Sequence, residues 1–294
     1  GFARSAKIHG RSKLKVNELR DALRERLPPR EGTSPGLFVE LCAGTAALSL
    51  RLHKEQAKPP VSRMGSKQGY ATSILHELGL YPGLKAERYL WCEPDDGCRL
   101  LLETYRNHDL ATATAEIIRG WKDEDPKSLW TRLRKEGPVV APTPRETARW
   151  TLALPGGAWT AMPPRAMYKG PGCHPNMGGM FQTTMAARYE DLDELPAEIT
   201  DGAVDPPLLP PNTVVYIDPP YVNTTGYKHN LGRDRVVELA LAWHAAGATV
   251  CISEQESIPE LVSAGWRVVD ITGKRLGQRR TFSDQKTEYL TIST

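Results

Sequence analysis

The residues best suited to chemistry lie in the stretch TVVYIDPPY, residues 213–221. Its first five residues are strand formers, and the two prolines after Asp218 have no N–H to donate to a neighbouring strand. The strand is therefore expected to end at a rigid turn that presents a carboxylate and backbone carbonyls. Together these groups can accept hydrogen bonds from both hydrogens of an amino group. Tyr221 adds a flat ring on which a planar base can stack, worth about 1–3 kcal/mol.

Two other expected strands also end in residues that can bind a ligand. The strand at 36–41 leads to Gly44, which permits a tight turn and close ligand approach. The turn lacks the further glycines of a dinucleotide-binding G-x-G-x-x-G loop, so it suits a cofactor without phosphates better than NAD or FAD. The strand at 88–93 ends in Glu93, which can accept hydrogen bonds from ribose hydroxyls. Taken alone, the glycine is more typical of an ordinary tight turn, and an acid here is also typical of a helix start.

These strand ends must be positioned by the elements around them. Alternating strands and helices with a strand pair at the end predict an α/β open sheet, which binds ligands at the carboxyl ends of its strands. From about 121 to 180 the chain is rich in Pro, Gly and Trp, which is typical of an inserted subdomain or a set of loops. Strands are predicted at 36–41, 88–93, 213–217, 248–253, 266–272 and 287–293, and helices at 13–27, 45–53, 69–80, 95–107 and 233–247.

Composition narrows the class of protein. The chain has 294 residues and 40% hydrophobic residues, enough for a core, and no apolar run approaches the roughly 18 residues of a membrane span. The first residues are basic and lack the apolar stretch of a secretory signal. Five cysteines without a CxxC pair argue against a disulfide framework and a structural zinc site. We therefore expect a cytoplasmic protein with no metal and no membrane association.

The net charge of +3 says little about partners, but basic residues are clustered. One cluster lies at residues 7–15 and another at residues 274–280. Such clusters permit binding to a phosphate backbone, although a solvated surface is an equally good interpretation of each.

The strand-DPPY combination resembles the catalytic motif of amino-methylating DNA methyltransferases, particularly the adenine-N6 group. FVELCAGTAAL (38–48) is similar to the cofactor loop of that family, and RMGSKQGYATSIL (63–75) to its G-G-K segment. ATVCISEQES (248–257) and GQRRTFSDQKTEYLTIS (277–293) resemble its later strands and closing hairpin. The similarity covers both ends of the chain and leaves the middle unmatched.

This resemblance implies a Rossmann-like methyltransferase fold of bacterial or phage origin. Residues 1–120 and 181–294 would form the catalytic domain, and 121–180 an inserted target-recognition region. The implied cofactor is S-adenosylmethionine, the partner double-stranded DNA, and the reaction methyl transfer to adenine N6 after base flipping. No oligomeric state is predicted. The implied catalytic residues are Asp218, Pro219, Pro220 and Tyr221; the cofactor-binding residues Phe38, Glu40, Cys42, Ala43, Gly44, Thr45, Ala46, Met64, Gly65, Ser66, Lys67, Glu93 and Asp191; and the nucleic-acid-binding residues Lys274, Arg275, Arg279 and Arg280.

The chain departs from the family pattern in three ways. Leu41, Cys42 and Ala46 replace the usual Pro, Phe and Gly, which removes a ring that packs on the cofactor. The G-S-K segment follows the cofactor loop instead of preceding it, and we expect it to reach the same pocket from another side. The acid that contacts the cofactor adenine is chosen from neighbouring candidates in RYEDLDELP, with Asp191 preferred.

Alternatives to adenine-N6 methylation follow from these departures. Cytosine N4 is one, although that group more often has Ser in place of Asp218. RNA or a protein glutamine is another substrate class with related Pro-Pro-Tyr motifs. A DNA-binding protein that has lost catalysis is the third.

Overall fold

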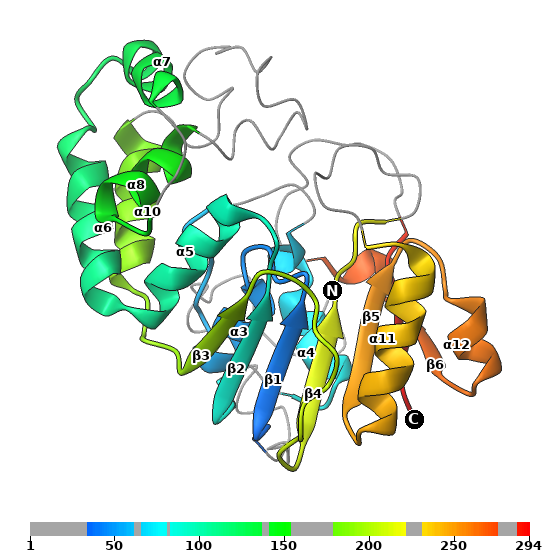
Figure 1. Ribbon diagram of the computed structural model, residues 1–294. Helices are drawn as coiled ribbons and strands as arrows, with labels where there is room; N and C mark the ends of the chain where they lie inside the picture. Colours follow the sequence, from blue (N-terminus) through cyan, green and yellow to red (C-terminus); the bar gives the residue numbers. More distant parts are fainter. Residues whose placement is uncertain are drawn as a thin grey trace, which may run out of the picture. The chain divides into compact units, whose positions relative to one another are not determined.

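A mostly parallel sheet organises the chain (Figure 1). The computed structural model describes residues 34–61, 66–80, 83–136, 141–153, 179–221, 231–275 and 287–294, and within them the sheet has seven strands in the order β3-β2-β1-β4-β5-β7-β6. The first five strands pair in parallel, whereas β7 runs antiparallel to both β5 and β6. The strands are β1 (Leu37–Leu41), β2 (Arg88–Cys92), β3 (Ala197–Thr200), β4 (Thr213–Ile217), β5 (Thr249–Glu254), β6 (Arg267–Asp270) and β7 (Tyr289–Ile292).

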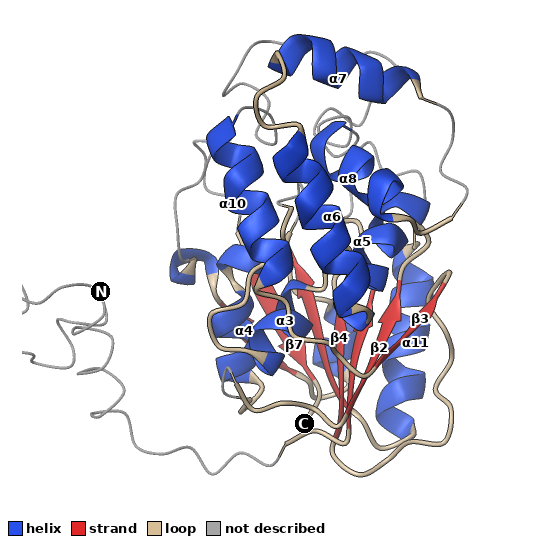
Figure 2. Cartoon of the chain, turned by 90° about the vertical axis from the view of Figure 1, so that its left-hand side faces the viewer, coloured by secondary structure: helices blue, strands red, loops and turns tan. Residues whose placement is uncertain are grey.

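Both faces of the sheet are buried, because side chains alternate between two apolar clusters. In β1, Phe38 belongs to one cluster, and Leu37, Val39 and Leu41 to the other. Helices α3 (Ala47–His53), α4 (Ala71–Glu77) and α5 (Asp96–Arg106) pack on the Phe38 side. Helices α11 (Arg233–Ala245) and α12 (Pro259–Ser263) cover the opposite side (Figure 1), and Figure 2 shows α11 across the sheet from α3 and α4. The sheet order with its antiparallel pair confirms the predicted Rossmann-like methyltransferase fold class.

A group of helices continues from α5. It contains α6 (His108–Gly120), α7 (Pro126–Lys135), α8 (Pro144–Ala153) and α10 (Gly179–Glu190). Helix α6 packs against α8 and α10, and α8 also contacts α5 and α7. The side chains of Asn107 and Asp125 cap the first turns of α6 and α7 by accepting hydrogen bonds from Leu110 N and Ser128 N. Figure 2 shows α7 at the end of this group that is farther from the sheet.

The structure agrees with most predicted elements and adds others. Helices α6, α10 and α12 and strand β3 were not predicted, and the predicted helix at 13–27 lies outside the described residues. The described parts of 121–180 contain α7 and α8, so this region holds helices rather than loops alone. The boundaries of a recognition region stay a prediction. None of the described helices is both long and apolar enough to cross a membrane.

Candidate active site

The ends of four neighbouring strands meet at one edge of the sheet. In the register of the sheet, Leu41 is opposite both Cys92 and Ile217, so β2, β1 and β4 end side by side. Backbone hydrogen bonds extend this alignment past the strands, from Ala43 N to Cys92 O (3.0 Å) and from Asp218 N to Leu41 O (3.3 Å). The three strand ends singled out in the sequence therefore lie together, and β5 brings Ser253 and Glu254 beside them.

The turn after β1 has an unusual backbone. Cys42, Gly44 and Ala46 all have positive φ, at 67°, 54° and 44°. Left-handed backbone costs a non-glycine residue roughly 1 kcal/mol or more, and such strain is concentrated at ligand sites. A Cβ placed on Gly44 would meet no atom within 4 Å, so the described residues leave the space above Gly44 open. The turn thus leaves room for a ligand to approach the backbone.

Glu93 fixes this turn to the end of β2. Its side chain is buried, and its Oε2 accepts a hydrogen bond from Gly44 N at 2.7 Å. Its Oε1 accepts one from Asp95 N at 2.9 Å, at the start of α5. Each carboxylate oxygen can accept more than one hydrogen bond, so these two contacts are compatible with the predicted bonds to a ribose. The ribose contact itself stays a prediction.

Asp218 lies at the centre of a buried polar cluster. Lys67 Nζ is 2.7 Å from Asp218 Oδ1, and Ser253 Oγ donates to the same oxygen at 3.1 Å. The hydroxyl of Tyr221 donates to Glu288 Oε1 at 2.6 Å. Lys67 Nζ also lies 3.7 Å from Glu288 Oε1 and 4.6 Å from the centre of the Tyr221 ring. One cation and two carboxylates thus share this corner, which we call the Asp218 corner.

Burial and charge act in opposite directions within the Asp218 corner. Burial raises the pKa of Asp218, and the neighbouring Lys67 ammonium counteracts that rise. Burial likewise raises the pKa of Glu288 against the effect of Lys67. For Lys67, burial lowers the pKa, but Asp218, Tyr221 and Glu288 together raise it well above its ordinary value. The lysine is therefore charged at neutral pH.

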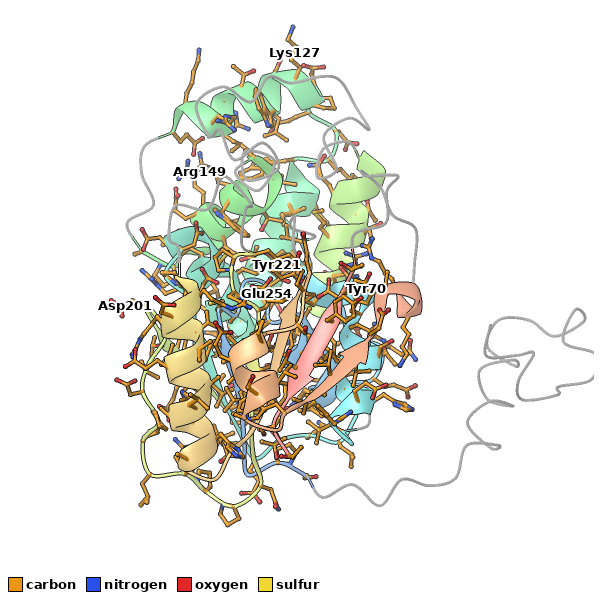
Figure 3. All side chains as sticks on the ribbon, turned by 90° about the vertical axis from the view of Figure 1, so that its right-hand side faces the viewer. Tyr70, Lys127, Arg149, Asp201, Tyr221 and Glu254 are labelled. Atoms are coloured by element: carbon orange, nitrogen blue, oxygen red, sulfur yellow. The ribbon has the colours of Figure 1, made fainter. Side chains whose placement is uncertain are left out.

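Glu254 is an additional acid at this edge. It is buried at the end of β5, and burial raises its pKa to about 7, with a contribution from the charge of Asp218. Figure 3 shows Glu254 and Tyr221 at the same end of the strands. The sequence interpretation did not select Ser253, Glu254 or Glu288. Ser253 and Glu254 could have been found by the rule used for Glu93, because they also end an apolar strand.

The G-S-K segment contacts the site through Ser66 and Lys67. Ser66 Oγ lies 3.1 Å from Thr45 Oγ1 in the turn after β1, and the next residue, Lys67, reaches Asp218. Ser66 and Lys67 therefore connect the turn with the Asp218 corner. Met64 and Gly65 lie outside the described residues.

Three predicted cofactor residues are not brought to this opening. Phe38 is fully buried and packs edge-on against Tyr89, with ring centres 6.4 Å apart. Glu40 is buried on β1, and its Oε1 accepts hydrogen bonds from both the backbone N (2.8 Å) and the hydroxyl (2.5 Å) of Ser49. Both side chains form part of the packing under α3.

Asp191, the third of these residues, also lies away from the strand ends. It pairs with Lys54, the C-cap residue of α3, at 2.8 Å. Because α3 starts at the turn after β1 and runs away from it, its C-terminus lies on the opposite side of the fold from the Asp218 corner. The structure therefore does not place Asp191 where the sequence interpretation expected an adenine contact.

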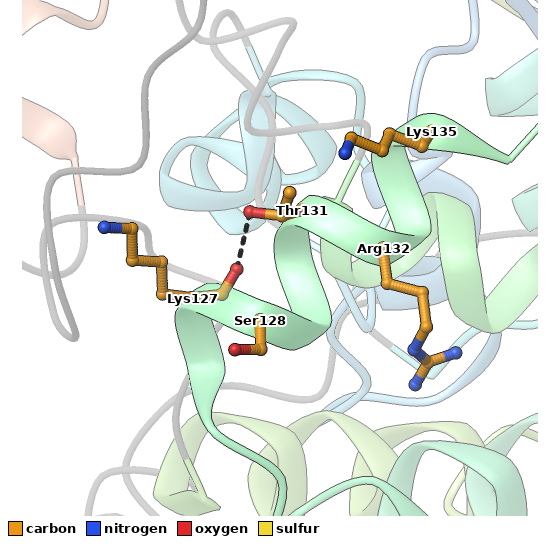
Figure 4. A pocket seen from close by; sticks show the side chains of 5 residues that line it. All are labelled: Lys127, Ser128, Thr131, Arg132 and Lys135. Carbon is orange, nitrogen blue, oxygen red and sulfur yellow. Dashed lines mark hydrogen bonds between the residues drawn. The ribbon is translucent and has the colours of Figure 1, made fainter.

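The predicted basic cluster near the C-terminus is partly engaged. Lys274 Nζ pairs with Glu77 Oε1 at 2.7 Å, and the Arg275 side chain packs against Gly69. Arg279 and Arg280 lie outside the described residues. A different basic surface is formed by α7, where a shallow hollow of about 660 Å³ is lined by Lys127, Ser128, Thr131, Arg132 and Lys135 (Figure 4).

The charge of the site fits a cationic cofactor without phosphates. Glu93 and Asp218 flank the turn after β1. The Gly44 N–H, which a phosphate would need, already donates to Glu93. A sulfonium and an ammonium group, by contrast, are attracted by these acids. The residues present therefore fit S-adenosylmethionine better than a dinucleotide.

Comparisons with known proteins identify no family for the chain. No family model matches the chain, and no curated protein does. Among solved structures, the rRNA methyltransferase aviRa from Streptomyces viridochromogenes is similar over 94% of this chain and 82% of that chain, with 12% sequence identity and a TM-score of 0.30. A likeness at this level carries no argument about fold, substrate or mechanism.

Proposed function

We propose that the protein transfers a methyl group from S-adenosylmethionine to the exocyclic N6 amine of adenine in DNA. The observation that carries this proposal is the position of Asp218. Its carboxylate is held at the end of β4, directly beside the open turn after β1 and close to the Tyr221 ring. An amine acceptor, an aromatic platform and room for a cofactor thus meet at one edge of the sheet.

The two carboxylate oxygens of Asp218 differ in their contacts with the described residues. Oδ1 is bound by Lys67 and Ser253, whereas within the described part of the chain Oδ2 accepts no hydrogen bond. The Asp218 side chain is 20% exposed. In the proposed complex Oδ2 accepts one N–H of the substrate amine and the carbonyl of Pro219 accepts the other.

These two hydrogen bonds would make the substrate amine a better nucleophile. The lone pair of an aromatic amine is delocalised into its ring, so the planar amine is a weak nucleophile. Two acceptors placed on its hydrogens favour a pyramidal nitrogen and concentrate the lone pair. Bound S-adenosylmethionine would supply a methyl group already activated by its sulfonium. Orientation and exclusion of water by the chain then provide most of the remaining acceleration, and the proton lost from nitrogen passes to solvent.

The substrate base must leave the duplex to reach this corner, which costs a few kcal/mol. Stacking on Tyr221 offsets part of that cost. The Tyr221 ring is held in place by its hydroxyl, which donates a hydrogen bond to Glu288. Its orientation is therefore fixed before a base arrives.

Contacts to the DNA backbone are assigned to α7 in addition to the C-terminal basic segment. Lys127 and Lys135 line the α7 hollow, and α7 lies within the region 121–180 predicted to recognise the target. Arg132 beside them pairs with Glu124 at 2.8 Å, so the two lysines supply most of the charge available for phosphates.

The test is nucleoside mass spectrometry of DNA incubated with the protein and S-adenosylmethionine. N6-methyladenine is expected with the wild type and not with Asp218→Ala, which controls for a contaminating host enzyme. N4-methylcytosine without N6-methyladenine would replace the proposal by the cytosine alternative. Preferential methylation of RNA would move the substrate to that class. Absence of calorimetric binding of S-adenosylmethionine would favour a non-catalytic DNA-binding protein.

A further inference from the structure

The buried lysine of the Asp218 corner has no role in the reaction described so far. We propose that Lys67 is a positioning residue, an internal counter-ion that keeps Asp218 ionised with Oδ1 occupied and Oδ2 turned toward the substrate amine, and that Glu288 balances its charge. This inference deepens the proposed function and rests on it. It concerns a contact between two protein side chains, so it can also be measured without cofactor or DNA.

Lys67 forms a buried ion pair with Asp218. The Lys67 and Glu288 side chains are only 7% and 8% exposed, and the lysine reaches Asp218 at hydrogen-bond distance. A buried ammonium is costly unless it is paired, so this lysine stabilises the fold only while the carboxylates are charged. The longer distance of 3.7 Å to Glu288 makes that residue the secondary partner.

A second set of contacts holds Asp218 without help from the lysine. Tyr216 Oη and Ser253 Oγ lie 2.7 Å apart, and Ser253 in turn donates to Asp218 Oδ1. The backbone N of Asp218 also bonds to β1. Removing the charge of Lys67 should therefore leave the strand end and the side-chain rotamer of Asp218 in place. The specific contribution of Lys67 is electrostatic.

The surroundings of Asp218 are otherwise acidic. Lys67 is the cation that acts on both Asp218 and Glu288, so its removal would leave these two carboxylates without it and disfavour their ionisation. A protonated Asp218 would place an O–H donor where the N–H of the substrate amine needs an acceptor. At Asp218 itself the acting charge is that of Lys67. The charge of Asp218 in turn acts on Lys67, Glu288, Tyr216, Tyr221, Glu254, Glu40 and Cys42, and Arg233 also acts on Glu254.

Two substitutions change the net charge of the Asp218 corner in opposite directions. Lys67→Met removes the cation at nearly constant volume and leaves two carboxylates. Glu288→Gln removes a neighbouring negative charge and keeps an acceptor for the Tyr221 hydroxyl. The double variant restores the net charge that the corner has in the wild type. A role in packing alone would make the double variant at least as impaired as Lys67→Met, whereas a charge role predicts rescue.

The direct measurement is a pH titration of the Asp218 carboxyl carbon by ¹³C NMR in the full chain labelled at aspartate. The signal is assigned by its loss in Asp218→Asn. We expect Lys67→Met to raise the titration midpoint by about one pH unit or more, the size of effect that a charge at this distance produces. Glu288→Gln should lower the midpoint or leave it in place. The double variant should return it toward the wild-type value. An unchanged midpoint in Lys67→Met would overturn the inference.

Methyl-transfer rates against pH provide the second readout. The acidic limb of the profile should move to higher pH in Lys67→Met, with activity recovered at alkaline pH and rescued at neutral pH in the double variant. Loss of activity at every pH without rescue would contradict the charge role. A wild type that transfers no methyl group, with the NMR midpoints shifting as expected, would reject the proposed function while supporting the electrostatic role of Lys67.

Discussion

The close packing of α8 on α5 predicts a destabilising substitution at Gly97, and the size of the effect follows from the contact distances. Gly97 lies in the first turn of α5, shortly after Glu93, and the buried indole of Trp150 on α8 covers it. A Cβ placed on Gly97 would lie 1.8 Å from Trp150 Nε1 and 2.5 Å from its Cδ1. No heavy-atom contact is tolerated at these distances, so Gly97→Ala must displace the indole and with it α8.

The expected cost is the difference between two terms. Forcing extra volume into a packed contact costs about 1–3 kcal/mol, and a rigid indole in the way places this case near the upper value. Replacing glycine by alanine in a helix returns at most about 1 kcal/mol. The net destabilisation is therefore about 2 kcal/mol, or a fall in Tm of about 4–8 °C for a domain of this size. Gly120→Ala, at the end of α6 with nothing within 4 Å of its Cβ, is the matched control and should be neutral or slightly stabilising.

A double-mutant cycle with Trp150→Leu separates the clash from other effects. Urea unfolding of the wild type, both single variants and the double variant gives the coupling energy. Because the smaller side chain leaves room for a Cβ, Gly97→Ala should cost little when it is combined with Trp150→Leu. The coupling should then be about 2 kcal/mol, far above the roughly 0.3–0.5 kcal/mol scatter of independent sites. Equal penalties with and without Trp150→Leu, or a Gly97→Ala protein as stable as the wild type, would refute the packing described between α5 and α8.

Three further predictions test the charges and the stacking surface. Glu40 has a pKa raised from 4.5 to about 7 in the fold, so the unfolded chain loses this proton first and the free energy of unfolding falls as pH rises from about 4 to about 7. Glu40→Gln, which can still accept both Ser49 bonds, should remove about 3 kcal/mol of pH dependence over that range in urea unfolding. Tyr221→Ala should weaken kcat/KM for DNA by about 5- to 150-fold in steady-state assays through lost stacking, whereas Tyr221→Phe keeps the ring and most of the activity. Replacing Lys127 and Lys135 by alanine should lower the slope of log K against log salt by about one to two units in DNA-binding titrations, with little change in S-adenosylmethionine affinity.

The strand ends of the sheet could be predicted because their signals are local. The run at 213–217 was predicted to the residue as β4, since strand formers are bounded by Asp-Pro-Pro, which cannot continue a ladder. Helix α6 was not predicted, because its buried side is made of small or weakly apolar residues such as Ala111, Thr114 and Ala115. Strand β3 was missed because it is a short, half-exposed edge strand.

The partners within the site depend on tertiary structure and could not be predicted from spacing. Lys67 was assigned to the cofactor, yet the fold pairs it with Asp218, far along the chain. Glu288 reaches Tyr221 because β7 inserts antiparallel between β5 and β6. No local pattern encodes such a pairing of buried charges. Phe38 and Glu40 matched a motif by sequence, but strand alternation turns them into the packing under α3.

The central claim is that the turn after β1 and the Asp218 corner are two halves of one site, the first binding cofactor and the second activating the amine. Calorimetric binding of S-adenosylmethionine and methyl transfer, measured in parallel on Gly44→Val and Asp218→Ala, test it most directly. Valine at a φ of 54° strains the turn and fills the open space above it. The account predicts that Gly44→Val loses binding and transfer together, whereas Asp218→Ala binds the cofactor nearly as the wild type does and transfers nothing. Wild-type transfer by Asp218→Ala, or undiminished cofactor binding by Gly44→Val in a folded protein, would contradict it.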